Sequence, residues 1–490
     1  MGCTTLLVGK KASYDGSTMM ARNEDSGATR FSLKKFTVMT PDKQPRHYVS
    51  VLSKVEIDLP DNPMRYTQVP NARSNDGIWG EAGVNEKNVA MTETETITSN
   101  ARVQGADPLV PGGIGEEDML TIVLPYISTA REGVLRLGKL LEEYGTYEMN
   151  GIGFQDEDEV WWMETLGGHH WFAVRIPDEC YAVIPNQQGI DFFDLVDAFG
   201  KKKNNLCSED LIDFIRDNHL DLTVRTGEDN ALLEEDDEFD ARAAFGGSTD
   251  SDHSYNTPRA WYMLRYFNPN TYKWDGEDAE FTPVSDDLPF CETPEKLITD
   301  YDIKYILSSH YQGTPYDPYG KHGDDSLHGA FRPIGINRNC DMVLTQIRPY
   351  MPDELKAVQW VAFGSNAFNT MVPFYTNVNK TPDYFAYTPE KPSTDSFYWA
   401  NRIIGALADA SFATSGTVIE RYQQAVGRKG HELLNKYDRE YREGTDPVRF
   451  AEQANEAFSA MAREATDDAL DKVLFNATVG MKNAFSHEDA

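Results

Sequence analysis

Cysteine is scarce in this chain, and the spacing of the cysteines excludes both a disulfide framework and a structural zinc site. Five cysteines occur in 490 residues, which is an odd number, and they include no Cys-x-x-Cys pair. They are Cys3, Cys180, Cys207, Cys291 and Cys340. A disulfide framework and a structural zinc site both need paired or closely spaced cysteines. The cysteine usage therefore predicts reduced thiols, as in a cytoplasmic protein.

Long apolar runs are absent, and basic residues are outnumbered. No stretch of about 18 consecutive apolar residues occurs, and no basic start precedes an apolar segment, so we expect neither a membrane span nor a secretory signal. Lys and Arg total 46 against 79 Asp and Glu, which gives a net charge of -33. Such a surface repels phosphate backbones and anionic lipid head groups. We therefore expect a cytoplasmic protein with no nucleic-acid and no membrane partner.

Several catalytic motifs are also missing from the sequence. There is no His-Glu-x-x-His helix and no Gly-x-Ser-x-Gly elbow, and the glycine-rich residues 111–115 lack the Lys-Ser/Thr ending of a P-loop. His310, His322 and His328 lie in a Gly/Asp/Tyr-rich region that could form a loop-borne metal site, but they lack a recognised ligand spacing. We expect no metal and no cofactor.

The most informative feature that is present is a cysteine at the third position. If Met1 and Gly2 are removed, Cys3 acquires a free α-amine beside its own thiol. An α-amine titrates near ~7.7–8 and a free thiol near ~8.5, so one residue can supply both nucleophile and base near neutral pH. Arg22 follows later in the N-terminal segment, and a guanidinium close to the thiol would favour the reactive thiolate. We therefore interpret Cys3 as a candidate N-terminal nucleophile.

Other interpretations of Cys3 remain open at this level. An early cysteine also fits an inert, buried small hydrophobe. Lipidation of a Met-Gly-Cys start is a second alternative, although the myristoylation pattern has Ser or Thr at the sixth position and this chain has Leu6. Ordinary removal of Met1 would leave Gly2 blocking the amine, so the nucleophile hypothesis requires an additional cut.

The pattern of apolar residues predicts a layered α+β protein. A β-hairpin is expected over residues 4–8 and 18–23, around a turn at residues 14–17. Helical spacing of apolar residues predicts two helices within residues 116–144, one long helix from residue 417 onward and another over residues 447–474. The other expected strands are residues 77–80, 89–94, 151–154, 160–165, 170–176 and 181–185. Helices that cover antiparallel sheets are the arrangement that this order favours.

The domain organisation is expected to be a large core followed by a helical part. We predict a core over residues 3–350 and a mainly helical C-terminal portion over residues 351–490. Residues 227–240 carry a run of acids that lacks the spacing of an EF-hand, so we interpret them as a solvated acidic insertion in the core.

Several motifs, in order along the chain, carry a resemblance to a known family. They are Cys-Thr-Thr-Leu-Leu-Val-Gly at 3–9, Asp-Gly-Ser at 15–17, Ala-Arg-Asn-Glu-Asp-Ser at 21–26, Gly-Val-Asn-Glu-Lys-Asn-Val-Ala-Met at 83–91, Tyr-Ala-Val-Ile-Pro-Asn-Gln at 181–187, Ser-Tyr-Asn-Thr-Pro-Arg at 254–259, Gln-Ile-Arg-Pro at 346–349 and Phe-Gly at 363–364. With these motifs the sequence resembles the cysteine dipeptidases of peptidase family C69 and, more distantly, the secernins. The resemblance implies the N-terminal nucleophile hydrolase fold, a four-layer αββα sandwich with helical C-terminal additions.

The resemblance also implies a set of site residues and an activity. Cys3 matches the nucleophile, Arg22 and Asp25 match residues that position the thiol and hydrogen-bond the α-amine, Asn186 matches an oxyanion asparagine, and Arg259 matches a later active-site arginine. Each of them, taken singly, also fits a structural ion pair, turn or helix cap. The implied activity is broad-specificity hydrolysis of dipeptides through a thioester on Cys3, by an enzyme that forms a homo-oligomer.

The remaining predictions concern the substrate. A dipeptide carries an ammonium group at one end, which a carboxylate such as Glu93 or Glu95 would bind. The expected partners are therefore small peptides. Two alternatives of other classes stay open: an N-acyl amide hydrolase of the same fold, like penicillin V acylases and bile salt hydrolases, and a non-catalytic, secernin-like interaction protein in which Gly2 keeps Cys3 blocked.

Overall fold

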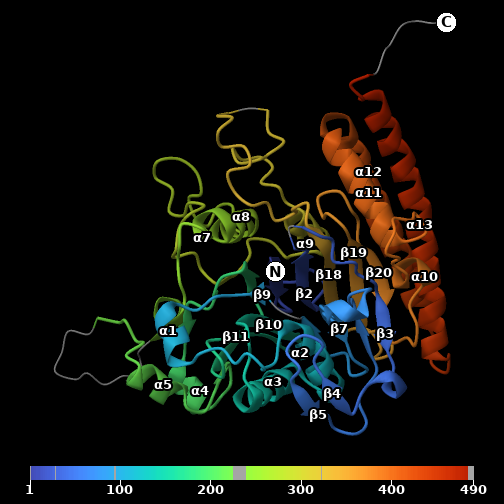
Figure 1. Cartoon of the computed structure of the whole chain (residues 1–490). Coiled ribbons are helices and arrows are strands. Elements are labelled where there is room, and N and C mark those ends of the chain that lie inside the picture. Colours follow the sequence, from blue (N-terminus) through green and yellow to red (C-terminus); the bar gives the residue numbers. More distant parts are fainter. Residues whose placement is uncertain (1, 28, 93–94, 225–238, 322, 484–490) are drawn as a thin grey trace, which may run out of the picture.

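Two seven-stranded antiparallel sheets form the centre of the molecule, with helices around them (Figure 1). The computed structural model describes residues 2–27, 29–92, 95–224, 239–321 and 323–483. The predicted combination of helices with antiparallel sheets is confirmed. Within the described ranges, no helix combines the length and apolar character needed to cross a lipid bilayer.

The first sheet has its N-terminal hairpin at the centre. Its order is β17-β13-β1-β2-β18-β19-β20. The strands are β1 (Cys3–Val8), β2 (Thr18–Asp25), β13 (Tyr181–Ile184), β17 (Cys291–Glu292), β18 (Asn339–Ile347), β19 (Ala357–Phe363) and β20 (Val372–Tyr375). The predicted hairpin is confirmed, because the Asp15 carboxylate accepts the backbone N–H of Ser17 at 3.1 Å and Gly16 adopts a positive φ of 81°.

The second sheet contains the predicted meander. Its order is β15-β12-β11-β10-β8-β7, with β9 also paired to β10. The strands are β7 (Ala82–Val84), β8 (Ala90–Thr92), β9 (Glu95–Thr96), β10 (Asn150–Gln155), β11 (Val160–Thr165), β12 (Trp171–Arg175) and β15 (Asn205–Cys207). The strand predicted at residues 77–80 is wrong, because Gly77 and Trp79 adopt φ values of 90° and 50° that break the extended conformation.

The two sheets pack face to face with helices on both outer sides. Leu7 and Met20 of the first sheet share a core with Trp162 and Phe172 of the second. Helices α2 (Glu116–Val123) and α3 (Ala130–Tyr144) cover the outer face of the second sheet. Helices α8 (Thr257–Phe267), α9 (Asp300–Leu307), α11 (Phe397–Ala410), α12 (Phe412–Glu440) and α13 (Pro447–Val479) pack on the side of the first sheet. In the described chain, helices therefore lie on both sides of the paired antiparallel sheets (Figure 1).

The two long C-terminal helices predicted from the sequence are confirmed. Helix α12 begins at Phe412, five residues before the predicted start, and α13 begins at Pro447, whose preceding Asp446 accepts the N–H of Arg449 at 3.2 Å. The division at residue 350 stays a prediction, and the paired strands β18 and β19 lie on either side of it. Of the predicted acidic insertion, residues 227–238 lie outside the described residues.

Shorter elements complete the fold. The remaining helices are α1 (Ala101–Ala106), α4 (Leu195–Phe199), α5 (Leu211–Asp217), α6 (Ala241–Phe245), α7 (Asp252–Tyr255) and α10 (Asp383–Ala386), with the 3-10 turns η1 (Pro41–Lys43), η2 (Ser74–Asp76) and η3 (Leu124–Tyr126). The remaining strands are β3 (Thr37–Met39), β4 (His47–Val49), β5 (Glu56–Asp58), β6 (Tyr66–Gln68), β14 (Phe192–Phe193) and β16 (Phe239–Asp240).

Candidate active site

The register of β1 and β2 places Cys3 and Arg22 on one face of the first sheet. Cys3 pairs with Glu24, and Thr5 pairs with Arg22. Because directly opposite residues share a face and side chains alternate along a strand, Cys3 and Arg22 lie on the same face as Leu7. That face packs against the second sheet. Cys3 therefore lies at the end of the core between the two sheets, and its side chain is buried.

Arg22 is the cation next to the Cys3 thiol. Its Nη2 atom lies 2.9 Å from Cys3 Sγ and 2.9 Å from Glu116 Oε1, while Nη1 forms an ion pair with Glu81. Burial by itself would lower the pKa of Arg22, but the negative charges of Cys3, Glu81 and Glu116 outweigh it and raise that pKa well above its usual value. A permanently charged guanidinium in contact with the sulfur favours the thiolate.

Two acids hold Arg22 in place, and they differ in charge state. Against the cost of burial, Arg22 and Lys34 lower the pKa of Glu81 to about 2. Burial raises the pKa of Glu116 to about 7 despite Arg22. Glu81 also adopts a φ of 64°, which is costly for a residue with a side chain and is typical of functional sites. Glu81 is therefore the ionised anchor of Arg22, whereas Glu116 titrates near neutrality.

A second buried cation continues this charged layer behind the thiol. Lys34 lies 2.8 Å from Glu81 and 2.6 Å from Glu24, and all three side chains are buried. Glu24, Cys340 and Asp341 bring potential metal-ligand atoms within 4.8 Å of one another. The Lys34 ammonium already lies against this group, and it supplies there the positive charge that a cation would bring.

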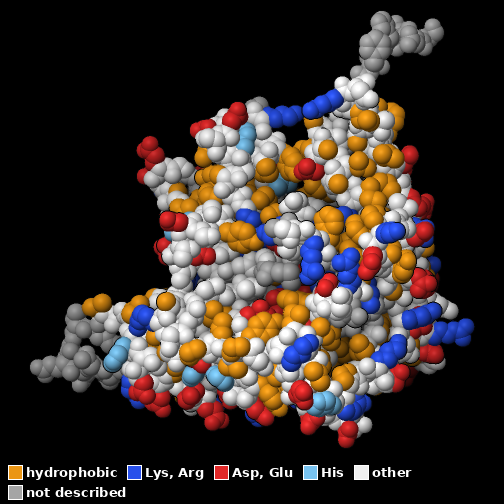
Figure 2. Space-filling view, viewed as in Figure 1, with side chains coloured by type: hydrophobic (Ala, Val, Ile, Leu, Met, Phe, Trp, Pro, Cys, Tyr) orange, Lys and Arg blue, Asp and Glu red, His pale blue; other side chains and the backbone are white. Residues whose placement is uncertain are grey.

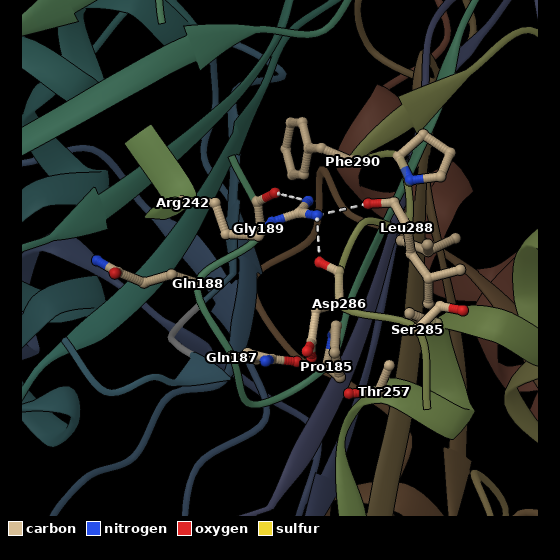
Figure 3. A pocket seen from close by; sticks show the side chains of 13 residues that line it. Pro185, Gln187, Gln188, Gly189, Arg242, Thr257, Ser285, Asp286, Leu288 and Phe290 are labelled. Carbon is tan, nitrogen blue, oxygen red and sulfur yellow. Dashed lines mark hydrogen bonds between the residues drawn. The ribbon is translucent and has the colours of Figure 1, made fainter. Parts of the chain in front are cut away.

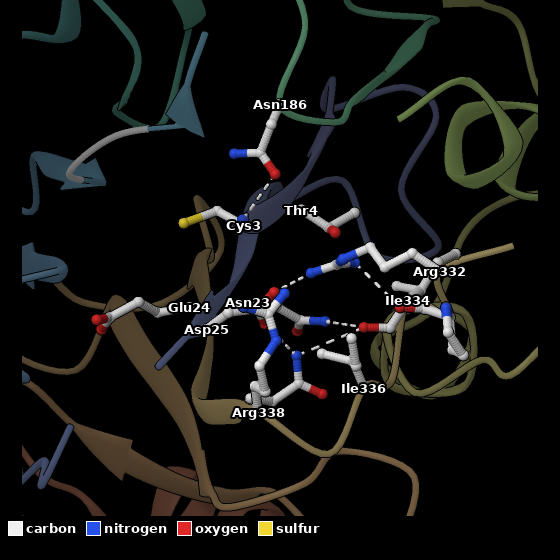
Figure 4. A network of polar contacts seen from close by, with 12 residues as sticks. Cys3, Thr4, Asn23, Glu24, Asp25, Asn186, Arg332, Ile334, Ile336 and Arg338 are labelled. Atoms are coloured by element: carbon white, nitrogen blue, oxygen red, sulfur yellow. Dashed lines mark hydrogen bonds and ion pairs between the residues drawn. The ribbon is translucent and has the colours of Figure 1, made fainter. Parts of the chain in front are cut away.

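Asn186 and Arg259 hold the backbone of Cys3 from the other side, and Figure 4 shows the Asn186 side chain pointing at the Cys3 nitrogen. Asn186 follows β13, and its Oδ1 atom accepts the backbone N–H of Cys3 at 3.0 Å and an Arg259 N–H at 2.9 Å. Its Nδ2 atom donates to the carbonyl of Thr96 at 3.1 Å. Fully buried Arg259, in the first turn of α8, also donates to the Cys3 carbonyl and to Thr4 Oγ1. Four of the predicted residues are therefore brought together, because Arg22, Asn186 and Arg259 each contact Cys3.

Asp25, the fifth predicted residue, lies on the Gly2 side of Cys3. Its backbone N–H donates to the Gly2 carbonyl at 2.9 Å, and its carboxylate accepts a hydrogen bond from Arg332 (Figure 4). The same carboxylate accepts a hydrogen bond from Asn339 at 2.6 Å. A Cβ atom at Gly2 would lie 2.7 Å from Asp25 Oδ2 and closer still to the Tyr255 hydroxyl. The space before Cys3, between Asp25 and Tyr255, therefore accommodates glycine, whereas a larger residue would displace these side chains.

Several residues that complete the site carry no sequence signal. Arg332 and Asn339 lie in none of the motifs, and Glu116 is one of three acids that open a helix. Glu81 is two residues before the motif that starts at Gly83, which is the one hint available. Glu93, predicted to bind substrate, lies outside the described residues. Glu95 belongs to β9, but its side chain is outside them, so both assignments stay predictions.

Two other regions, the histidine-containing segment considered from the sequence and a small cavity, have structural contacts of their own. His310 Nδ1 lies 2.8 Å from Asp317 Oδ1, and His322 lies outside the described residues. A small cavity behind the Asn186 loop is lined by residues such as Gln187, Arg242 and Thr257, and Figure 3 shows Arg242 donating to backbone carbonyls across it. Cys3 does not line this cavity, so it is separate from the thiol.

The loop that carries Asn186 is anchored by a buried acid, and this leads to a prediction about pH. Glu164 accepts the N–H groups of Gly189 at 2.7 Å and Trp162 Nε1 at 3.0 Å, yet burial raises its pKa from 4.5 to about 7. Between these two pH values the unfolded chain loses this proton and the folded chain keeps it, so stability falls as pH rises. We expect a loss of about 3 kcal/mol from this group between pH 4.5 and 7.

Urea unfolding of wild type and Glu164→Gln at pH 5 and pH 8 measures this effect. The substitution should remove about 3 kcal/mol from the difference in unfolding free energy between the two pH values. Glu143→Gln, at an exposed position of α3, is the matched control. If Glu164→Gln keeps the pH dependence of wild type, ionisation of Glu164 is not its source.

Comparisons with known proteins identify the family of this chain. The profile of Peptidase family C69 matches residues 2–425. The chain is 50% identical to a dipeptidase of Bifidobacterium longum (strain NCC 2705) and 52% identical to a probable dipeptidase A of Streptococcus pyogenes serotype M3, with both chains covered in full in each case. It is 46% identical to dipeptidase A of Lactobacillus helveticus, over 89% of this chain and 88% of the relative. The chain therefore belongs to peptidase family C69 and is a peptidase.

Proposed function

We propose that this chain is a cysteine dipeptidase of broad specificity whose nucleophile is Cys3, exposed as the first residue by removal of Met1 and Gly2. The observation that carries the proposal is the 2.9 Å contact between Arg22 Nη2 and Cys3 Sγ. A buried thiol held against a guanidinium, at the end of a strand, is arranged for reactivity rather than for packing. The names of the relatives supply the substrate class.

The proposed reaction has two steps. In the first, Cys3 Sγ attacks the carbonyl carbon of the peptide bond, and the α-amine of Cys3 takes the thiol proton and passes it to the departing nitrogen. The C–N bond breaks, and the first residue of the dipeptide remains as a thioester on sulfur. In the second step water attacks this thioester, the α-amine accepts the water proton, and the thiol and the free amino acid are regenerated.

The surrounding residues have separate roles in this scheme. Asn186 Oδ1, which accepts the Cys3 N–H in the chain with Gly2 present, would accept from the freed α-amine and orient its lone pair. Arg259 would hold the Cys3 carbonyl in place. Asp25 would lie beside the free amine, next to the space that Gly2 occupied before its removal. The Asn186 amide is our candidate oxyanion donor, together with a backbone N–H, and one such donor typically contributes about 10²–10³ in rate.

We also propose that the fold is that of the N-terminal nucleophile hydrolases. The order of layers supports this assignment, since two antiparallel sheets pack face to face between helices. The position of Cys3 supports it as well, because the first residue of a central strand at the end of the inter-sheet core can present both a thiol and an amine.

Two measurements on purified protein test the proposed function. The first is the intact mass with N-terminal sequencing, for which we expect a chain that starts at Cys3. The second is hydrolysis of a panel of unblocked dipeptides beside N-acyl amino acids, for which we expect turnover of many dipeptides. A chain that retains Gly2 and is fully active contradicts the mechanism, and preference for the N-acyl compounds contradicts the substrate class.

A further inference from the structure

Helix α2 begins with three buried acids, of which one points toward the thiol. Glu117 accepts hydrogen bonds from Ser50 Oγ at 2.7 Å and from a backbone N–H at 2.6 Å, and Asp118 caps the helix by accepting the N–H of Gly115 at 2.9 Å. These two acids have structural partners. Glu116 differs, because its Oε1 atom contacts Arg22 at 2.9 Å, the same guanidinium that contacts Cys3 Sγ. Its buried Oε2 atom, like that of Glu117, accepts no hydrogen bond from any described residue.

Glu116 lies at the distance from the sulfur that a substrate ammonium requires. A single atom, Arg22 Nη2, contacts both Cys3 Sγ and Glu116 Oε1 at 2.9 Å. In a dipeptide the α-nitrogen is two covalent bonds from the carbonyl carbon that is attacked. A carboxylate that binds this nitrogen must therefore lie close to the attacking sulfur. Glu116 meets this requirement, because one Arg22 nitrogen atom is in contact with both Glu116 Oε1 and Cys3 Sγ.

Glu148 stands directly behind Glu116. Its Oε1 atom accepts the backbone N–H of Glu116 at 2.8 Å, from the loop before β10, and its side chain is only partly buried. Burial raises the pKa of both carboxyls, which means that neither has enough positive charge nearby to compensate it. Figure 2 shows acidic side chains gathered in the hollow of this face. Apart from Arg22, the contacts described for Glu116 and Glu148 bring no cation to this side of the thiol.

Arg22 cannot supply that charge alone. Its one positive charge faces the thiol, the ionised Glu81 and Glu116. A buried carboxylate without a full counter-charge is costly, and an ammonium group with three N–H donors would both neutralise it and satisfy its open oxygen. A ligand that brings its own cation to this position is therefore favoured over an uncharged one.

We propose that Glu116, supported by Glu148, is the subsite for the free α-ammonium of the substrate. This inference rests on the proposed function and deepens it. The subsite selects peptides whose cleaved bond follows the first residue, and it disfavours N-acylated compounds, which present no charge to Glu116. It thereby distinguishes a dipeptidase from an N-acyl amide hydrolase built on the same nucleophile.

The test compares a dipeptide with its N-acetyl analogue in four proteins. We expect wild type to prefer the free dipeptide in kcat/KM, and Glu116→Gln and Glu148→Gln each to reduce that preference by about 10- to 100-fold, mainly through KM of the free dipeptide. Glu81→Gln is the matched control, because it removes the other Arg22 anchor. It should slow both substrates by the same factor and leave the preference unchanged.

Each outcome separates the inference from the proposed function. If Glu116→Gln and Glu148→Gln slow both substrates equally, the acids act only on Arg22 or on folding, and the ammonium subsite is refuted. Glu148 contacts the backbone of Glu116, so Glu148→Gln decides the question even if Glu116→Gln fails to fold. Wild type that hydrolyses no dipeptide at all would instead refute the proposed function.

Discussion

Replacement of Cys3 by alanine is expected to lower kcat/KM for dipeptides by about 10⁴-fold or more, since losses of this size follow removal of the nucleophile from other hydrolases that form covalent intermediates. The buried Cβ of alanine preserves the packing of β1, so the loss should come without a large change in unfolding free energy. Steady-state hydrolysis of one good dipeptide, followed by release of free amino acids, measures the effect.

Two variants control this experiment. Cys3→Ser keeps an N-terminal nucleophile, but its hydroxyl gains little from a neighbouring cation at neutral pH, so its activity should fall between those of wild type and alanine. Cys207→Ala removes a thiol whose pKa burial raises to about 12, in β15 at the edge of the second sheet, and should retain wild-type activity. If the Cys3→Ala protein keeps more than a tenth of wild-type activity, the assignment of Cys3 as the nucleophile is refuted.

Replacement of Arg22 by methionine should cost both stability and activity. The substitution leaves Glu81 and Glu116 buried without their shared cation, and breaking a buried ion pair typically costs about 3–5 kcal/mol. It also removes the charge that favours the thiolate, so we expect kcat/KM to fall by about 10²–10³ and the acidic limb of the pH–rate profile to move to higher pH. Urea unfolding and a pH–rate series measure the two effects separately.

The lysine variant distinguishes charge from geometry at this position. Arg22→Lys keeps the positive charge but cannot reach the thiol, Glu81 and Glu116 with one planar fork. It should recover much of the stability and only part of the activity. If Arg22→Met has the same urea unfolding midpoint and the same pH–rate profile as wild type, Arg22 neither balances the buried acids nor activates the thiol.

The parts of the fold that local patterns control were predictable from the sequence. The Asp15-Gly16 turn and the alternation on either side of it gave the hairpin, and this alone places Cys3 and Arg22 on one face. Helix α3 repeats apolar residues such as Val134, Leu137 and Leu141 at the spacing of one helical face, and all three are buried.

The rest depends on contacts that leave no local pattern. Asp25 meets Arg332 and Asn339, which are 307 and 314 residues later in the chain. Glu116 looks like one acid among three at a helix start, and only the packed structure separates it from Glu117 and Asp118. Such residues are chosen by the arrangement of distant elements, and a short window of sequence does not contain that information.

The central position of β1 has a consequence for how the protein is made. The strand that begins with Cys3 pairs with β2 at once, but its other neighbour, β13, starts at Tyr181, and the partners of Asp25 follow only at Arg332 and Asn339. At about 5–20 residues per second, a ribosome needs roughly 15–60 s to add the intervening chain. During that time the nascent polypeptide carries Cys3 without the residues that surround it in the folded protein, so on the proposed mechanism we expect hydrolytic activity only once translation is nearly complete.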